Sequence, residues 1–443
     1  MNKHLSHVQI ITLGYLLMVL TGTLLLLLPF SSASGTSVGF RTAFFTSVSA
    51  SCVTGLTLLP TGSSWSFFGQ LVILLLIQVG GLGFMTIATL FFHILNKRMR
   101  LSERETLLES LNLTRIEGIM HFSGKIIAGT LLLEGLGAAL LALRFIPLFG
   151  FGRGLWLSCF HAVSAFCNAG FDLFSGAAAS PSLMLYADDP LVCLVIIFLI
   201  VVGGLGFLVW DDLRRNRFHW RRYTLHTKLV LSVSTFLLLG STLLFFFFEA
   251  SATGAGQSLG ARILEALFSS ATARTAGFNS VDTAALSDAS RLLTIFLMLI
   301  GGSPGSTAGG IKTPTVAVLF LALFASFRRE KKAAAFGRAI PQGTILKSIT
   351  IFLTNTGCAF LAALWLCAAD HLPAMDALFE TISAIGTVGM STGVTASLSP
   401  FSSLLVALLM FMGRVGSVSF SMALLEKKQQ PPVAYPEEAV TIG

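Results

Sequence analysis

The stretch TISAIGTVGMSTG, residues 381–393, lies between long apolar segments but is itself a poor candidate for a membrane-crossing helix. A transmembrane helix needs about 20 consecutive, mostly apolar residues. This stretch is shorter, and it contains glycines at positions 386, 389 and 393. Such a segment is typical of a re-entrant loop, so the rest of the chain must decide where it lies.

The composition is that of a polytopic membrane protein. Of 443 residues, 54% are hydrophobic and 11% are charged, whereas ordinary soluble domains contain about 25% charged residues. Apolar segments near or above the length of a span cover residues 8–30, 67–95, 119–143, 191–210, 229–248, 292–324, 345–368 and 404–425. The first is too long for the core of a signal peptide, about 7–15 residues, and is expected to be retained. The six cysteines show no ligand-like spacing and are interpreted as small apolar residues.

The basic residues fix the topology. Lys and Arg gather in three short loops, near residues 97–115, 214–228 and 328–347. By the positive-inside rule all three loops face the cytoplasm, so an even number of crossings separates each from the next. An odd number of apolar segments lies in each interval, which leaves the short segments 42–56, 155–171 and 261–278 as re-entrant hairpins. Non-helical backbone is tolerated at membrane depth only inside protein or beside water. The net charge of +8 therefore indicates membrane orientation and no nucleic-acid partner.

A fourfold repeat supports this interpretation. The loops read FFTSVSASCVTGLT (44–57), CFHAVSAFCNAGFD (159–172), LFSSATARTAGFN (267–279) and LFETISAIGTVGMS (378–391), and their glycines recur at 55, 170, 277 and 389. VGGLGF occurs at 79–84 and again at 202–207, with GGSPGSTAGG (301–310) and GRVG (413–416) at matching places. We therefore predict an all-α fold of four fused helix–pore loop–helix units. It has eight transmembrane helices and four re-entrant pore helices in pseudo-fourfold arrangement around one pore.

The four loops have the chemistry of a cation filter. A short inward helix points the negative end of its dipole at the centre, and a glycine with positive φ lets the next carbonyl oxygens turn towards one axis. Rings of backbone carbonyls replace the hydration shell of an alkali cation. The predicted coordinating residues are Val53, Thr54, Gly55, Asn168, Ala169, Gly170, Thr275, Ala276, Gly277, Thr387, Val388 and Gly389. The fourth loop, Thr-Val-Gly-Met, comes close to the Thr-Val-Gly-Tyr of potassium channels.

The chain resembles the Trk/Ktr/HKT potassium transporter superfamily, and within it the ion-translocating membrane subunit of bacterial Ktr systems. The resemblance covers nearly the whole chain and rests on VTGL at 53, NAGF at 168, RTAGFNS at 274, GTVGM at 386 and GIK at 310. One departure is Pro304, which is added to the small residues of the 301–310 segment.

The resemblance implies potassium uptake, often sodium-dependent, in the bacterial inner membrane, with K⁺ and possibly Na⁺ as transported or activating ions. It also implies a homodimer with one pore per protomer, membrane lipid around it, and a cytosolic ring of nucleotide-binding RCK subunits of the KtrA or KtrC kind. The chain carries no phosphate-binding glycine motif of its own, so nucleotide control would belong to that partner. No cofactor bound by this chain and no enzymatic activity are expected, and both termini are predicted to be cytoplasmic.

The predicted units are 1–98, 119–212, 224–326 and 345–425, joined by cytoplasmic loops 99–118, 213–223 and 327–344 and followed by a tail, 426–443. In the third unit, a segment is either a simple helix break or, as the resemblance implies, a gating loop. It consists of Gly301, Gly302, Ser303, Pro304, Gly305, Ser306, Thr307, Ala308, Gly309 and Gly310. Arg414, mid-helix in an apolar span, is expected to tie backbone carbonyls. The resemblance implies that it is also an electrostatic barrier and a latch beside this loop. Lys312 is expected to shape the inner cavity.

Arg274 directly precedes the third predicted filter strand. A fixed positive charge there would repel a cation from the path, so Arg274 is expected to support the filter from behind, paired with Glu380 or Glu265. Glu134 is either a coupling-ion site or a tie between helices. A broken-helix secondary transporter for another small solute is the alternative function, although such folds usually show two related halves. An enzyme is disfavoured because the spans lack a catalytic pair.

Overall fold

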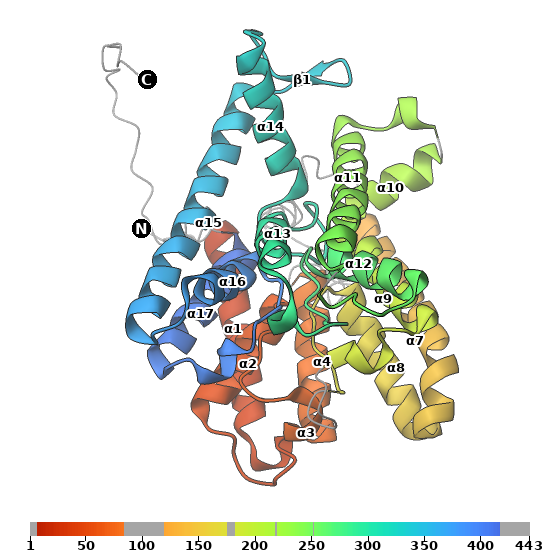
Figure 1. Cartoon of the computed structure of the whole chain (residues 1–443), viewed down its shortest axis with the longest axis vertical. Helices are drawn as coiled ribbons and strands as arrows, with labels where there is room; N and C mark the ends of the chain where they lie inside the picture. The colour runs from red at the N-terminus through yellow and green to blue at the C-terminus, as the bar shows by residue number, and fades with distance from the viewer. Residues whose placement is uncertain (1–6, 84–118, 175–181, 218, 251, 417–443) are drawn as a thin grey trace.

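The computed structural model describes residues 7–83, 119–174, 182–217, 219–250 and 252–416. Within these residues the chain is mostly helical and repeats one pattern of a long helix followed by two shorter helices (Figure 1). Predicted segments that fall at 84–118, in the tail 417–443 and at the extreme N-terminus lie outside the described residues. The predicted unit boundaries stay predictions.

Each unit opens with a long apolar helix. These are α1 (His7–Leu27), α7 (Ile119–Phe149), α11 (Leu225–Phe248) and α15 (Gln342–Ala369). All four are long and apolar enough to cross a membrane. Their exposed leucines and phenylalanines, such as Leu132, Phe236 and Leu361, suit an environment of lipid.

The second helix of each unit is too short to cross a bilayer. These helices are α2 (Phe40–Cys52), α8 (Phe151–Phe166), α12 (Leu259–Thr272) and α16 (Ala374–Gly386), with 13 to 16 residues each. At about 1.5 Å rise per residue they are roughly 20–24 Å long, which is less than the hydrocarbon layer of about 30 Å. In α2 and α16 the last residues are all buried, so these helices end inside the protein. They are the re-entrant pore helices that the sequence predicts.

The third helices start with strong N-terminal signals. They are α4 (Phe67–Leu82), α9 (Pro190–Leu205), α13 (Asp288–Leu299) and α17 (Pro400–Val415). The side chains of Ser66, Asp189, Ser287 and Ser399 each accept a hydrogen bond from an amide of the first turn. Such caps satisfy amides that have no partner within the helix.

All four third helices end after 12 to 16 residues, before the end of the predicted apolar spans. The sequence predicts such a break only in the third unit. α4, α9 and α17 end at Gly83, Gly206 and Gly416, whose φ angles are 84°, 93° and 97°. After Gly206 the chain bends by 91° into α10 (Phe207–Asn216), so the predicted span 191–210 is not one straight helix. Only a residue without a Cβ adopts such angles readily. In the third unit α13 is followed by the glycine-rich segment and α14 (Thr313–Phe327), as predicted.

Glycines allow the third helices to touch the pore helices. A Cβ on Gly80 would lie 2.1 Å from the carbonyl oxygen of Ser51, and one on Gly203 would lie 2.0 Å from that of Phe166. Gly413 has the same relation to Ile385, also at 2.0 Å. Each of these carbonyls lies four residues before a filter glycine. The repeated VGGLGF and the GRVG at the corresponding place in the fourth unit therefore each supply a glycine at which the third helix packs against the pore helix.

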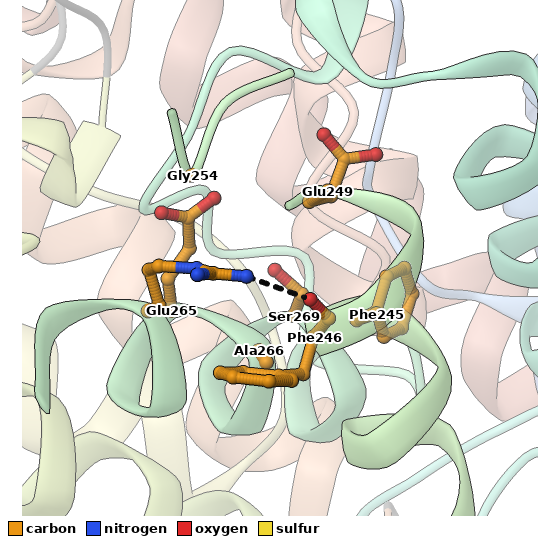
Figure 2. A pocket seen from close by; sticks show the side chains of 8 residues that line it. Phe245, Phe246, Glu249, Gly254, Glu265, Ala266 and Ser269 are labelled. Atoms are coloured by element: carbon orange, nitrogen blue, oxygen red, sulfur yellow. Dashed lines mark hydrogen bonds between the residues drawn. The ribbon is translucent and has the colours of Figure 1, made fainter. Parts of the chain in front are cut away.

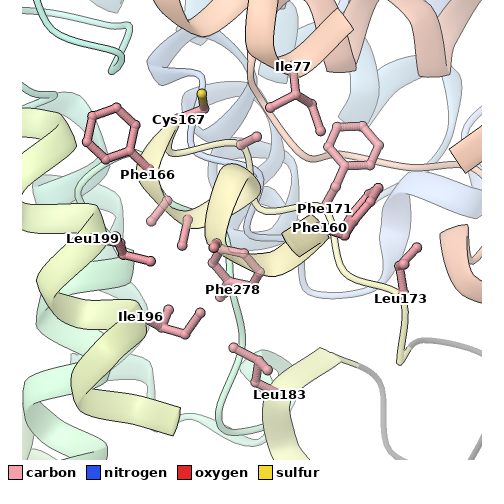
Figure 3. Packing of buried hydrophobic residues seen from close by; sticks show 14 of the residues in the cluster. Ile77, Phe160, Phe166, Cys167, Phe171, Leu173, Leu183, Ile196, Leu199 and Phe278 are labelled. Atoms are coloured by element: carbon pink, nitrogen blue, oxygen red, sulfur yellow. The ribbon is translucent and has the colours of Figure 1, made fainter. Parts of the chain in front are cut away.

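The core consists of two large clusters of buried side chains, the first mainly from units one and two and the second mainly from units three and four. Phe278, which follows the third filter glycine, lies in the first cluster with Phe160 of α8 and Ile196 and Leu199 of α9 (Figure 3). The third loop therefore packs against the second unit.

Short elements complete the fold: α3 (Thr61–Ser64), η1 (Pro29–Ser31), η2 (Ser182–Tyr186), η3 (Trp220–Arg222), η4 (Thr283–Ala285) and η5 (Val394–Ser397).

The predicted loop 327–344 contains a small hairpin that the sequence does not reveal. β1 (Ala334–Ala335) pairs with β2 (Arg338–Ala339) around Phe336 and Gly337, both with positive φ. The ring of Phe336 lies 6.0 Å from that of Trp220, in the loop between α10 and α11. Two of the basic loops therefore lie at the same end of the molecule, opposite α3 (Figure 1).

The glycine contacts can be tested by adding one methyl group. We expect Gly203→Ala to destabilise the protein by about 1–3 kcal/mol, because its Cβ would overlap a backbone carbonyl that cannot move freely. The matched control is Gly240→Ala in the middle of α11, where a Cβ meets nothing within 4 Å and helix propensity improves by about 0.5–1 kcal/mol. Thermal unfolding of the detergent-solubilised protein measures both. Equal midpoints for the two variants would contradict the packing.

Candidate functional site

The four loops after the pore helices form a closed ring of backbone. A Cβ on Gly55 would lie 2.5 Å from the Ala169 oxygen, and one on Gly170 would lie 2.7 Å from the Ala276 oxygen. A Cβ on Gly277 would lie 2.3 Å from the Val388 oxygen, and one on Gly389 would lie 2.0 Å from the Thr54 oxygen. Each loop thus touches the next in chain order and the fourth touches the first. The structure thus brings together the four loops that the sequence predicts for the filter, and the Asn168 side chain adds a hydrogen bond to the Thr275 hydroxyl at 3.2 Å.

The backbone of each loop alternates in handedness. Val53, Asn168, Thr275 and Thr387 have φ between 51° and 71°, and two residues later each glycine has φ between 67° and 98°. The residue between them has an ordinary negative φ. Alternating handedness gathers successive amides on one face of the strand and leaves the carbonyls on the other. Positive φ is rare for β-branched residues such as Val53 and costs about 1–3 kcal/mol, so the surrounding structure must enforce it.

The amides of these strands face back towards the pore helices. The Thr54 and Val388 amides donate to the carbonyls of Ser49 and Ser383, both at 2.8 Å. The next amides, of Gly55 and Gly389, donate to the hydroxyls of the same two serines at 3.0 and 3.1 Å. With the amides paired behind, the carbonyl oxygens are free to face the centre of the ring.

Units two and three are braced differently. The Ser164 hydroxyl donates to the Phe171 carbonyl at 2.7 Å, and the Thr272 hydroxyl donates to the Phe278 carbonyl at 2.6 Å. In both cases the accepting carbonyl belongs to the residue after the filter glycine. The four loops therefore share one backbone shape, whereas their hydroxyl contacts are of two kinds, one in units one and four and the other in units two and three.

Glu380 supports the fourth loop directly. It is fully buried in α16, and its carboxylate accepts from the Ser391 hydroxyl at 2.7 Å and from the Thr395 hydroxyl at 2.5 Å. Ser391 lies two residues after Gly389, so the carboxylate holds the outward path of the filter strand. The predicted role of filter support therefore has a geometric basis.

The predicted pairing of Arg274 with Glu380 or Glu265 is wrong. The Arg274 guanidinium donates to the carbonyl and hydroxyl of Ser234 in α11, at 3.5 and 3.3 Å. Among the described residues no carboxylate lies within 4 Å of it. Glu380 is held by hydroxyls and Glu265 accepts from Thr253 at 2.6 Å, so both carboxylates have other partners. Sequence separation along a loop does not reveal which way a long side chain turns.

The glycine-rich segment of the third unit lies directly beneath the ring. A Cβ on Gly309 would lie 2.1 Å from the Thr387 hydroxyl, and one on Gly310 would lie 2.8 Å from the Gly386 carbonyl oxygen. The segment also bonds to the second unit, since the Phe207 amide donates to Gly305 at 2.7 Å and the Ser303 amide donates to Gly204 at 3.0 Å. It is thus a folded loop held at the inner side of the filter.

Arg414 fastens this loop to the first unit. Its guanidinium donates to the Thr307 carbonyl in the loop and to the carbonyls of Gly80 and Gly81 at the end of α4. The distance to Gly81 is 2.9 Å. Lys312 donates to the Ala308 carbonyl at 2.7 Å and so crosses the loop from its other end. The predicted tie of Arg414 to backbone carbonyls is present.

Two further polar side chains lie behind the second loop. Glu134 accepts from Gln78 at 3.1 Å and contacts the Cys167 sulfur at 3.8 Å, which joins α7, α4 and the second filter loop and favours the helix-tie interpretation. His161 was missed by the sequence analysis. Its Nδ1 pairs with the Leu157 carbonyl at 2.7 Å and its Nε2 accepts from the Leu173 amide at 3.4 Å. The sequence signal was a histidine within a mostly apolar pore helix.

A pair of acidic residues lies where α11 leads into α12. Glu249 and Glu265 flank a small pocket between α11 and α12 (Figure 2), and the Thr253 hydroxyl lies 2.9 and 2.6 Å from their carboxylates. Burial alone would raise the pKa of Glu249, but hydrogen bonds from Ser290, Ser287 and Thr253 outweigh it and hold the pKa below the usual value. Its stabilising contribution is therefore present at neutral pH and is lost as the pH falls through that lowered pKa.

A ring of four re-entrant loops between long apolar helices defines a multi-pass membrane protein of the pore-loop class. Its family follows from comparison with known proteins. The chain belongs to the TrkH family of cation transport proteins, whose family model matches residues 6–432.

Relatives agree with this assignment over their full lengths. The chain is 41% identical to the potassium/sodium uptake protein NtpJ of Enterococcus hirae, covering 100% of this chain and 98% of the relative. It is 37% identical to the Ktr system potassium uptake protein B of Bacillus subtilis, covering 98% and 96%. The fold is similar to the crystal structure of the potassium transporter TrkH from Vibrio parahaemolyticus, with TM-score 0.75, 18% identity and coverage of 96% and 86%.

The role of Glu380 can be tested with a conservative pair of variants. Glu380→Ala leaves the hydroxyls of Ser391 and Thr395 without their carboxylate and is expected to cost roughly 2–4 kcal/mol of unfolding free energy. Glu380→Gln keeps the shape and one acceptor oxygen, so its loss should be clearly smaller. Thermal unfolding of purified protein distinguishes them. If Ala and Gln have the same effect, the carboxylate does not brace the loop.

Proposed function

We propose that this chain moves K⁺ into the cell through the ring of four loops. The observation that carries the proposal is the closed contact of Gly55, Gly170, Gly277 and Gly389, each against the carbonyl of the next loop. Relatives of similar length are named potassium uptake proteins. Transport, rather than catalysis of a covalent reaction, is therefore the proposed activity, with K⁺ and possibly Na⁺ as the ions moved or sensed.

The proposed filter consists of backbone and contains no charged side chain. Carbonyl oxygens can replace the water around an alkali cation without neutralising it, so the ion binds and still leaves. The twelve residues are Val53, Thr54, Gly55, Asn168, Ala169, Gly170, Thr275, Ala276, Gly277, Thr387, Val388 and Gly389. Pore helices that end beside them add the negative ends of their dipoles, which favour a cation.

The proposed gate is the loop 301–310 with Lys312 and Arg414. It contacts Thr387 and Gly386 from the inner side, so an ion leaving the filter meets it first. The bonds of Arg414 to Thr307, Gly80 and Gly81 hold the loop in this position. The positive charges of Lys312 and Arg414 beside the path also raise the electrostatic barrier to the passage of a cation.

We also propose the wider setting of this transport. Relatives named as parts of Ktr systems support a multi-component assembly. A homodimer in the bacterial inner membrane, both termini in the cytoplasm and a nucleotide-binding RCK ring on the basic inner face complete the proposal. The basic loops that meet through Trp220 and Phe336 are the surface available for such a ring.

A bacterium that lacks its own potassium uptake systems tests the proposal. Expression of the chain, with a cognate ring subunit, should restore growth on low-potassium medium. Gly389→Ser should lower K⁺ over Na⁺ discrimination roughly tenfold or more, because a side chain there overlaps the Thr54 carbonyl and overpacking costs about 1–3 kcal/mol.

The matched control is Gly393→Ser, at a glycine with similar φ, 95°, that has nothing within 4 Å of its Cβ position. It should keep the discrimination of the parent chain. Failure of the parent chain to restore growth would favour a transporter of another solute. Equal K⁺ over Na⁺ discrimination in the two serine variants would contradict the proposed filter.

The gate can be tested separately by rubidium flux in proteoliposomes. Arg414→Ala removes charge-assisted hydrogen bonds, each contributing about 1.5–3 kcal/mol, so the loop should open at least about tenfold more often and flux should rise. Arg41→Ala is the control, because Arg41 also bonds backbone and hydroxyl groups but lies at the outer end near Leu398 and Ser403. Unchanged or slower flux in Arg414→Ala would contradict gating.

A further inference from the structure

A cleft opens on the membrane-facing side of the molecule between the second and third units. It has a volume of about 140 Å³ and lies between α9, α11 and α12. Its lining includes Ile200, Leu205, Leu231 and Leu238, while Arg274 and Gly302 also line it. Leu205, Leu231 and Leu238 are only partly buried, and Thr235 beside them is exposed. The cleft thus runs from an apolar mouth to a charged residue and the glycine-rich loop.

The charge in this cleft lacks a counter-charge. Among the described residues, the Arg274 guanidinium donates hydrogen bonds to Ser234 alone, at 3.3 and 3.5 Å, which is long for a charge-assisted hydrogen bond, usually about 2.7–2.9 Å. Its Nε is buried and, within the part of the chain that the structure describes, has no acceptor. A guanidinium withdrawn from water with no anion beside it is costly. An anion in the cleft would remove that cost.

The mouth restricts which anions can arrive. The partly exposed leucines belong to α9 and α11, whose exposed side chains apart from Thr235 are apolar, so the entrance faces hydrocarbon. A small inorganic anion would have to leave water and cross that layer, which is strongly unfavourable. A molecule with an apolar chain and a single anionic group partitions into the bilayer and can present that group to the partly buried Arg274. About 140 Å³ accommodates the head and the first part of a chain, with the rest among lipids.

We propose that the cleft between α9 and α11 binds a lipophilic carboxylate, such as the anion of a long-chain fatty acid, with its carboxylate on Arg274. The occupant would contact Gly302 of the glycine-rich loop through the same cleft. This site is separate from the ring of carbonyls. Its existence does not depend on the proposed transport of potassium.

The test is photolabelling of the full chain in liposomes with a dodecanoate that carries a diazirine on its alkyl chain. Labels should map by peptide mass spectrometry to α9 (Pro190–Leu205) and to the part of α11 that includes Leu231 and Leu238. Excess dodecanoate should compete, whereas its neutral methyl ester should compete about tenfold less, because the ester lacks the charge-assisted contact to the guanidinium. Sodium chloride should not compete.

Leu231→Trp should fill the mouth and reduce labelling about tenfold or more without touching Arg274. Leu243→Trp, the same change at an exposed position of α11 that does not line the cleft, should label like the parent. The proposal is overturned if the ester competes as well as the acid, if chloride competes, or if the two tryptophan variants label equally. Because labelling is read without transport, these outcomes are independent of the uptake assay.

Discussion

The four filter glycines lie so close to their neighbours that no side chain fits in the ring. Each is less than a van der Waals contact from a neighbouring carbonyl once a Cβ is added, and the contacts close on themselves. The position of every loop therefore depends on the next one. This single constraint requires four loops of similar backbone shape, which is why the chain repeats one unit about every 110 residues.

A second layer of close contacts transmits the constraint outward. Gly80, Gly203 and Gly413 let the third helices approach the ends of the pore helices, and α4, α9 and α17 stop soon afterwards. A helix that stops leaves carbonyls without partners. Arg414 supplies donors to two of these, at Gly80 and Gly81, and also to the loop of the third unit. One arginine thus satisfies a helix end and fixes the loop.

Sequence patterns could predict the parts of the fold that repeat or that follow from length and charge. The pore helices, the mutual contact of the four loops at their glycines and the interrupted third unit all belong to that group. The 91° bend after Gly206 was not predicted, because a glycine in an apolar run fits both a straight and a broken helix. The partner of Arg274 was predicted wrongly, since a flexible side chain near two carboxylates chose a backbone carbonyl and a hydroxyl instead.

The units differ wherever the ring does not force them to agree. Units one and four hold the glycine amide with a serine hydroxyl, whereas units two and three hold a carbonyl one residue later. Among the described residues, the third unit alone places a loop beneath the ring, and a single loop is enough because all four strands share one axis. Because the contacts that close the ring are made by backbone, the side chains of the four units can differ. The third unit carries both the glycine-rich loop and Arg274, which has no counter-charge among the described residues. Arg274 and Gly302 of the loop line the same cleft, so a molecule bound there would contact both.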